Sequence, residues 1–148
     1  MIVKNQNLKF NYFLIFFIFY TSLLVGFYFG EDLNSGASND WFGVNYPVIS
    51  DLSLDLKKTL LNYEDYNHRH SPIYLIFLSF FDKIGFSPDT IRFVHLNLSL
   101  LLVYFFYKCL VFQFSDIKRE ILIILSCSIF LSPTFRSLSI WVDSRNIG

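Results

Sequence analysis

The stretch from Phe10 to Gly30 carries no charged side chain, and it restricts the possible folds more than any other feature of the sequence. A helix needs roughly 20 apolar residues to cross about 30 Å of hydrocarbon at 1.5 Å per residue, and this stretch is long enough. Lys4 and Lys9 precede it, and Glu31 and Asp32 follow it. Basic residues before a span and acidic residues after it favour a cytoplasmic N-terminus. The sequence therefore predicts a first transmembrane helix over residues 10–30.

A cleaved signal peptide is the alternative interpretation of this stretch. The apolar region of a signal peptide is usually shorter and ends in a small-x-small cleavage site. Phe27-Tyr28-Phe29 occupies that place here. We therefore favour a helix that stays in the chain.

The composition indicates a membrane protein along the whole length. Hydrophobic residues make up 53% of the 148 residues and charged residues 16%, whereas soluble domains carry about 25% charged residues. The mean hydropathy is +0.44. The formal net charge is zero, so the chain has no bulk attraction to nucleic acid. We expect an all-α integral membrane protein.

A polar loop over residues 31–71 follows the first span. Its acids outnumber its bases, which is typical of the extracytoplasmic side: Glu31, Asp32, Asp40, Asp51, Asp55, Glu64 and Asp65 stand against Lys57, Lys58 and Arg69. Residues 34–39 are small and polar, so they predict an irregular loop.

An amphipathic helix is expected in the second half of this loop. The residues Ile49, Leu52, Leu56, Leu60 and Tyr63 recur at spacings of 3 or 4, which is typical of one helix face. A serine at position 50 is a plausible N-cap. Such a juxtamembrane helix fits the membrane interface. The alternative is a helix that packs on a larger extracytoplasmic domain, and the sequence does not separate the two.

Three further apolar segments, residues 72–86, 93–114 and 121–142, bring the expected number of transmembrane helices to about four. The segment 93–114 is long enough to span. The segment 72–86 reaches only about 22 Å at helical rise, so it spans only where the bilayer thins or neighbouring helices shield it. Pro133 is expected to break the helix in the last segment.

One connection conflicts with this order of spans. After three crossings, residues 115–120 would lie outside the cytoplasm, yet they carry Lys118 and Arg119. Basic residues, rather than the net charge, set the orientation of membrane helices. Either the rule is overridden here, or one short segment does not fully cross the membrane.

Motifs of soluble catalysis are absent: the sequence has no Walker loop, GxGxxG, HExxH or GxSxG. Ionisable residues near the membrane boundary remain as candidates. Asp40 could act as a general base for an acceptor hydroxyl or amine, or bind a divalent cation. The alternative is a solvated loop acid. No metal site is predicted, and Cys109 and Cys127 lie in apolar runs as small hydrophobes.

Basic residues form a second group of candidates. His68, Arg69 and His70 directly precede the second apolar segment. Arginine or protonated histidine can hydrogen-bond a lipid phosphate at that depth, and interfacial anchoring is the alternative. Arg136 lies in or beside an apolar segment, where an unpaired charge costs at least about 2.5 kcal/mol. We expect it to pair with Asp143 or with a ligand anion such as a lipid phosphate.

A series of landmarks resembles a known family. In order, the chain carries Asp40, His70-Ser71-Pro72-Ile73-Tyr74, Gly85, Arg92 and Leu131-Ser132-Pro133. The series resembles the N-terminal part of GT-C type membrane glycosyltransferases, closest in style to the protein mannosyltransferase, lipid A aminoarabinose transferase and RgtA/B/C/D-like families. Each motif is short, and the resemblance covers essentially the whole chain.

The resemblance implies that a sugar moves from a polyprenyl-phosphate carrier to an extracytoplasmic acceptor, in the bacterial inner (plasma) membrane. Asp40 then matches the loop acid that acts on the acceptor, and His70, assisted by Arg69, faces the carrier phosphate. The implied partners are the polyprenyl-phosphate-linked sugar and membrane lipids. Trp41 follows Asp40 where many relatives carry an Asp-Glu pair. A divalent cation therefore stays an open alternative, and neither cofactor nor oligomeric state is predicted.

Enzymes of this type usually have many more spans, so the chain is expected to be the N-terminal piece of a longer protein and to catalyse nothing alone. The alternative function is a non-enzymatic polytopic membrane protein, such as a transporter, flippase or assembly subunit. Transporters typically show repeats or Gly/Pro-broken helices at matching positions, and none is visible. An acidic first loop followed by a basic re-entry point favours the transferase.

Overall fold

The computed structural model describes residues 3–33, 36–66, 68 and 71–143, with side chains described from Tyr12 onward. Within these ranges all regular structure is helical, and no strand occurs. This confirms the all-α prediction.

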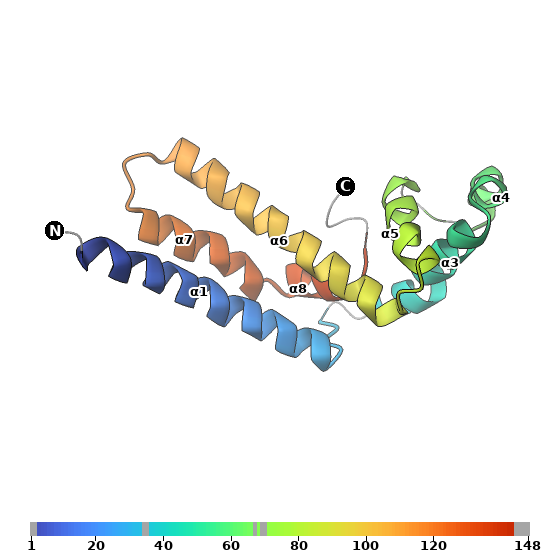
Figure 1. Ribbon diagram of the computed structural model, residues 1–148, viewed down its shortest axis with the longest axis horizontal. Helices are drawn as coiled ribbons and strands as arrows, with labels where there is room; N and C mark the ends of the chain where they lie inside the picture. The colour runs from blue at the N-terminus through green and yellow to red at the C-terminus, as the bar shows by residue number, and fades with distance from the viewer. Residues whose placement is uncertain (1–2, 34–35, 67, 69–70, 144–148) are drawn as a thin grey trace.

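Three helices form an elongated bundle. They are α1 (Val3–Tyr28), α6 (Pro88–Gln113) and α7 (Arg119–Cys127), and α7 continues through the 3₁₀ helix η3 (Ser128–Leu131) into α8 (Pro133–Ile140). The bundle is held by contacts between α7 and both long helices. Figure 1 shows that the start of α1 and the connection between α6 and α7 lie at the same end of the bundle.

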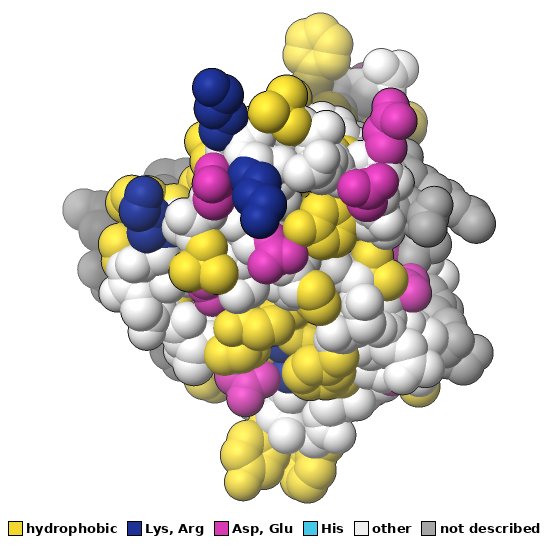
Figure 2. All heavy atoms as spheres, turned by 90° about the vertical axis from the view of Figure 1, so that its right-hand side faces the viewer, with side chains coloured by type: hydrophobic (Ala, Val, Ile, Leu, Met, Phe, Trp, Pro, Cys, Tyr) yellow, Lys and Arg dark blue, Asp and Glu magenta, His cyan; other side chains and the backbone are white. Residues whose placement is uncertain are grey.

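A compact group of short helices, here called the helical lobe, lies at the opposite end (Figure 1). It comprises α2 (Ala37–Asp40), the π-helix η1 (Trp41–Asn45), α3 (Tyr46–Leu54), α4 (Leu56–Leu61), the 3₁₀ helix η2 (Tyr63–Tyr66) and α5 (Ile73–Lys83). The closest packing inside the lobe is between α3 and α5. Figure 2 views this end of the molecule, where acidic and basic side chains are interspersed with hydrophobic ones.

Local sequence signals explain where the last helices begin. The Ser87 side chain caps α6 by accepting from the Thr90 amide at 3.2 Å, and Pro88 occupies the first turn, where its missing N–H costs nothing. Ser132 caps α8 in the same way. Gly85 adopts a φ of 91° between α5 and α6, a conformation that suits glycine.

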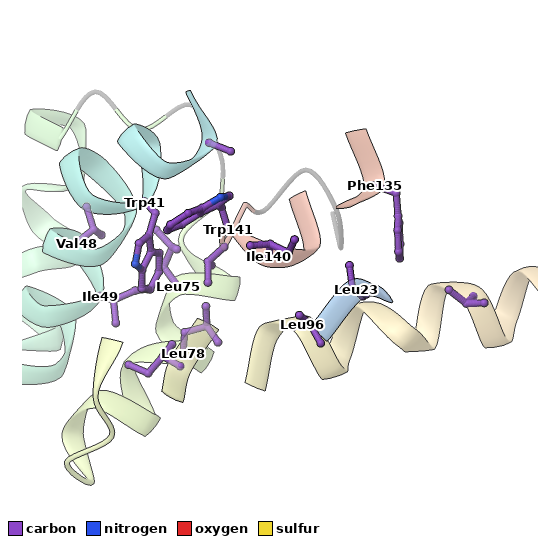
Figure 3. Close-up of a cluster of buried hydrophobic side chains, with 14 of the residues drawn as sticks. Leu23, Trp41, Val48, Ile49, Leu75, Leu78, Leu96, Phe135, Ile140 and Trp141 are labelled. Carbon is purple, nitrogen blue, oxygen red and sulfur yellow. The ribbon is translucent and has the colours of Figure 1, made fainter. Parts of the chain in front are cut away.

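A buried apolar cluster joins the lobe to the bundle. Trp41 and Leu75 are fully buried within the lobe, and Ile140 and Trp141 extend the cluster to the end of α8. Figure 3 shows the two tryptophans on facing elements, with Ile140 between Trp141 and the bundle. The lobe is therefore packed onto the bundle through its core.

The helices confirm only part of the predicted set of four spans. By length and composition, α6 is the one described helix suited to cross a membrane, and the pair 119–131 and 133–140 is a second only if it counts as one span despite a bend of 68°. In α1, the residues whose side chains are described form a shorter apolar helix over Tyr12–Tyr28. The bend at Pro133 confirms the predicted break. Four transmembrane helices are not confirmed.

The predicted span over residues 72–86 is not confirmed. The helix there, α5, has 11 residues, which is about 16 Å at helical rise. Its Leu75 and Leu78 are buried, and the helix packs on α3 rather than along the bundle. Its apolar composition reflects packing inside the lobe. Because α5 stays within the lobe, only α1 and α6 run between the two ends of the molecule before residue 114. The connection after α6 therefore lies at the end where α1 begins.

The predicted amphipathic helix is also corrected. Ser50 lies inside α3 and is not its N-cap. The helix breaks at Asp55, whose φ is −145° and whose side chain caps α4 by accepting from the Lys58 amide at 3.0 Å. Leu52 is buried, whereas Leu60 is exposed, so the two halves of the expected apolar face do not share one environment.

The predicted irregular loop over residues 34–39 is partly wrong as well. Residues 37–39 belong to α2, and residues 34 and 35 lie outside the described part.

Candidate functional site

The predicted site residues differ in their surroundings: one is exposed, two lie outside the described part of the chain, and one is buried. Asp40 is exposed and ends α2, directly before the buried Trp41. Arg69 and His70 lie outside the described residues. Arg136 is buried on α8, at the junction of bundle and lobe.

Arg136 forms a two-point ion pair with Glu31. Its Nε lies 2.5 Å from Oε1 of Glu31, and its Nη2 lies 2.6 Å from Oε2. Nη1 donates to Ser22 Oγ at 3.1 Å and to the Phe130 carbonyl at 3.3 Å, and Nη2 also donates to the Ser22 carbonyl at 3.0 Å. An arginine has five N–H donors. All five therefore have acceptors within the chain, and none is left for a phosphate.

This pair depends on a close approach of α1 to α8. A Cβ added at Gly26 would lie 2.5 Å from Oε2 of Glu31 and 2.8 Å from Nη2 of Arg136. The hydrogen bonds from Arg136 hold the pKa of Glu31 below its usual range, against the raising effect of burial. The sequence suggested Asp143 or a ligand anion as the partner, whereas the structure provides Glu31.

Arg92 is a second buried arginine, and its environment differs. It is 6% exposed, and its guanidinium lies 3.6 Å from the ring centre of Trp141 and 4.9 Å from that of Phe27. Nε donates to the Ile140 carbonyl at 3.2 Å, and Nη1 donates to Asp89 at 2.8 Å. Nη2 is buried without an acceptor among the described residues. A buried guanidinium nitrogen without a partner is costly, and this is the feature that sets Arg92 apart from Arg136.

A fully buried histidine lies one turn further along α6. His95 Nε2 is 2.7 Å from the Leu138 carbonyl, and Nδ1 is 2.5 Å from the Tyr74 hydroxyl. A carbonyl only accepts, so Nε2 carries the proton and Nδ1 accepts from Tyr74. Asp143 is 5% exposed and acts electrostatically on His95. The histidine thus links α5, α6 and α8.

A polar chain ties the lobe to the last described segment. Asn45 donates to the Val142 carbonyl at 2.8 Å, and its Oδ1 lies 2.7 Å from His68 Nε2. His68 Nδ1 lies 2.9 Å from the Tyr63 hydroxyl. These hydrogen bonds connect His68, which follows η2, through Asn45 to Val142, which follows α8. His68 therefore has a structural role in this arrangement.

Asp32 orders the turn that leads to Asp40. Its Oδ2 accepts from the Ser38 amide at 3.0 Å, from Ser38 Oγ at 2.7 Å and from the Gly36 amide at 3.3 Å. Burial alone would raise the pKa of Asp32, but these hydrogen bonds lower it overall. The turn holds the start of α2 and, three residues on, Asp40.

An apolar groove of about 710 Å³ runs beside α6. Tyr74 and Phe77 of α5 line it, together with α6 residues from Leu98 to Cys109 and with Ile129. Its polar end is therefore at Tyr74, which contacts His95.

No group of three or more possible metal ligands occurs among the described residues.

Sequence reasoning used Arg92 only as a landmark and missed its environment. A signal was present, because Arg92 opens a long apolar helix, where a charge needs a partner or a ligand. The contacts to Trp141 and Ile140 come from residues 48 or more positions away and leave no local pattern.

No family model, curated protein or solved structure matches this chain.

Proposed function

We propose that this chain is part of a membrane glycosyltransferase that moves a sugar from a polyprenyl-phosphate carrier to an acceptor on the extracytoplasmic side. The observation that supports this most is Arg92, a buried guanidinium with a nitrogen that has no acceptor among the described residues. It lies in the first two turns of α6, at the end of this apolar helix that adjoins the helical lobe (Figure 1). A lipid phosphate bridges those same two environments.

The distribution of basic residues over the two ends of the bundle is consistent with the same proposal. We take α1, α6 and the bent α7–α8 segment as three crossings, with the start of α1 in the cytoplasm. The connection after α6 then lies in the cytoplasm too, and its Lys118 and Arg119 obey the positive-inside rule. The helical lobe then lies on the extracytoplasmic side. This orientation removes the conflict that four crossings created.

In the proposed chemistry, Asp40 acts on the acceptor and Arg92 acts on the carrier phosphate. The acceptor oxygen or nitrogen attacks the anomeric carbon, and Asp40 takes up its proton. The bond from the anomeric carbon to the phosphate oxygen breaks, and its electron pair leaves with the polyprenyl phosphate. Arg92 would stabilise the charge that develops on that phosphate. Arg136 is a weaker candidate for this role, because its donors are already used by Glu31 and by carbonyls.

The test uses the gene product that contains this chain, in detergent, with polyprenyl-phosphate hexoses and pentoses as donors and a membrane extract as the acceptor pool. We expect release of free polyprenyl phosphate, with the label transferred to the extract. Asp40→Asn should slow transfer by about 10²–10⁴-fold, the usual contribution of a general base. Asp65→Asn, at an exposed acid of the same lobe, is the matched control and should leave the rate within about twofold.

Detergent also separates the proposal from its alternative. A flippase or transporter needs a membrane barrier, so in micelles it would bind the lipid-linked sugar without breaking the sugar–phosphate bond. Binding with no bond cleavage by the wild-type protein would overturn the transferase proposal. Equal rates for Asp40→Asn and wild type would overturn the role of Asp40.

A further inference from the structure

The two long helices of the bundle separate toward the end where α1 begins. Near the lobe they touch, since the Tyr20 hydroxyl donates to Asn97 at 2.8 Å and the rings of Phe27 and Phe93 lie 5.9 Å apart. Further from the lobe, α7 packs against both helices and lies between them (Figure 1). The bundle therefore forms a wedge that opens away from the lobe.

This wedge holds an apolar cleft of about 580 Å³, here called the bundle cleft. Its lining comes from all three helices and includes Phe13 of α1, Leu100 of α6 and Ile123 of α7. The lining on α6 covers residues 100–107, about 12 Å at helical rise, and a helix of that length and about 10 Å in diameter fills about 900 Å³. The cleft is smaller, and its volume lies within the roughly 300–1,000 Å³ of small-ligand sites. A flexible hydrocarbon chain fits this space better than a further helix.

Basic side chains lie at the open end of the bundle cleft. Tyr104 lines the cleft, and Lys108 Nζ lies 5.5 Å from the centre of its ring. Tyr12 also lines the cleft, and Arg119 acts on it electrostatically. The nearby acid Glu120 already accepts from the Tyr12 hydroxyl at 2.9 Å. The cleft thus combines an apolar interior with two exposed cations at its mouth.

We propose that the bundle cleft binds an acyl chain of an anionic phospholipid from the cytoplasmic leaflet, whose phosphate contacts Lys108 and Arg119. A lipid of that leaflet has its head group at this end and its chains directed toward the lobe, the direction in which the cleft narrows. The two cations select the head group, because basic side chains near the membrane surface attract anionic lipids. The site takes its membrane orientation from the proposed function, but its occupancy does not require sugar transfer.

Quenching of tryptophan fluorescence by brominated phospholipids tests the site in the purified gene product, in detergent. Tyr104→Trp places a reporter in the cleft lining, and Phe106→Trp places one at nearly the same depth, about 200° round α6 and outside that lining. Both native residues are aromatic and exposed, so both variants are expected to fold. The measured signal is the fluorescence added to that of Trp41 and Trp141.

The expected result is a head-group preference at one reporter only. Brominated phosphatidylglycerol should half-quench the tryptophan at position 104 at a concentration about tenfold lower than brominated phosphatidylcholine. The two lipids should quench the tryptophan at position 106 equally. Unbrominated phosphatidylglycerol should relieve the quenching at position 104, and inorganic phosphate, which has no chain to fill the cleft, should not.

Paired variants in the Tyr104→Trp background test the cations. Lys108→Gln/Arg119→Gln should bring the two lipids to within about twofold of each other. The matched control is Lys57→Gln/Lys58→Gln, at two exposed lysines of the lobe, and it should keep the preference. An equal loss of preference in both double variants would contradict the assignment of the phosphate.

Three other results would overturn the proposal: equal quenching by the two lipids at position 104, the same preference at position 106, or relief by inorganic phosphate. Absence of quenching at position 104 would do so too, since another part of the gene product would then fill the cleft. No turnover is involved. A lipid preference without sugar transfer would sink the proposed function alone, and transfer without the preference would sink only the lipid site.

Discussion

Glu31 and Arg136 lie 105 positions apart in the sequence and form a two-point ion pair, with Nε–Oε1 and Nη2–Oε2 distances of 2.5 and 2.6 Å. The pair joins the end of α1 to α8, across the bend that follows α7. Every guanidinium donor is satisfied, so the pair acts as a structural clamp. Removing this ion pair should therefore lower the stability of the fold more than it lowers the affinity for a ligand.

Arg136→Ala should destabilise the protein strongly. Removing one partner of a fully buried ion pair costs about 3–5 kcal/mol, because it leaves the other charge without compensation. The loss here should lie at the lower end of that range, because the Glu31 side chain is 21% exposed. The double variant Glu31→Gln/Arg136→Met should lose less than Arg136→Ala alone. Thermal unfolding in detergent measures both. The control is Arg119→Ala, at an exposed arginine, and a loss there as large as that of Arg136→Ala would contradict the clamp.

Gly26→Ala should also destabilise the protein, by a steric route. The added Cβ would lie 2.5 Å from Glu31, 2.8 Å from Arg136 and 3.1 Å from Ile140. All three contacts are shorter than normal van der Waals distances, so the ion pair must open or α1 must shift. Gly43→Ala is the matched control, since nothing lies within 4 Å of its added Cβ. Equal melting temperatures for the two variants would argue against a close approach of α1 and α8.

Acid should weaken the fold through Glu31 and Asp32. The pKa of each carboxyl is lowered in the folded chain, for Glu31 by hydrogen bonds from Arg136 and for Asp32 by those from Ser38 and Gly36, which outweigh burial. A lowered pKa contributes stability above the unfolded value, and that stability is lost as the pH falls through the folded value.

The melting temperature should therefore fall once the pH drops below the ordinary values of 4.5 for Glu31 and 3.8 for Asp32. Glu31→Gln should make this decline shallower while lowering stability at neutral pH. Asp116→Asn, on the exposed connection after α6, is the control. An unchanged acid limb in Glu31→Gln would exclude Glu31 as its source.

The orientation can be checked with single cysteines in a background without Cys109 and Cys127. Asn62→Cys lies in the helical lobe and Ser115→Cys in the connection at the other end. A membrane-impermeant maleimide should label position 62 in intact cells, and position 115 only after permeabilisation. Labelling of both positions from the same side would contradict three crossings.

Local signals predicted some elements well. The two longest apolar segments predicted α1 and α6, and Pro133 predicted the bend between η3 and α8. The predicted span at α5 is not confirmed, and the composition of the helix explains why it was expected. Leu75 and Leu78 are buried against the lobe while Phe77 and Phe80 are exposed, so its apolar character serves both protein packing and the outer surface. Hydropathy alone does not distinguish such a helix from a short span.

The candidate site was less accessible to sequence reasoning. Asp40 was identified by its loop position, and its role stays a prediction. The environment of Arg92 depends on a contact across 48 positions, and the partner of Arg136 lies 105 positions away. Such pairs are created by the packing of α8 against α1 and α6, and no spacing along the chain encodes them.

The helices of the bundle are unequal in length. Helix α6 has 26 residues, about 39 Å, whereas the bent crossing has only residues 119–131 before its 68° bend, about 20 Å at α-helical rise. In a bilayer with about 30 Å of hydrocarbon, the two sides of the protein would face opposite mismatches, and the lipid beside α7 would have to thin. A thinned annulus shortens the distance between leaflets on one flank only. In the proposed membrane orientation, the activity of the protein should therefore depend on the acyl-chain length of the surrounding lipid.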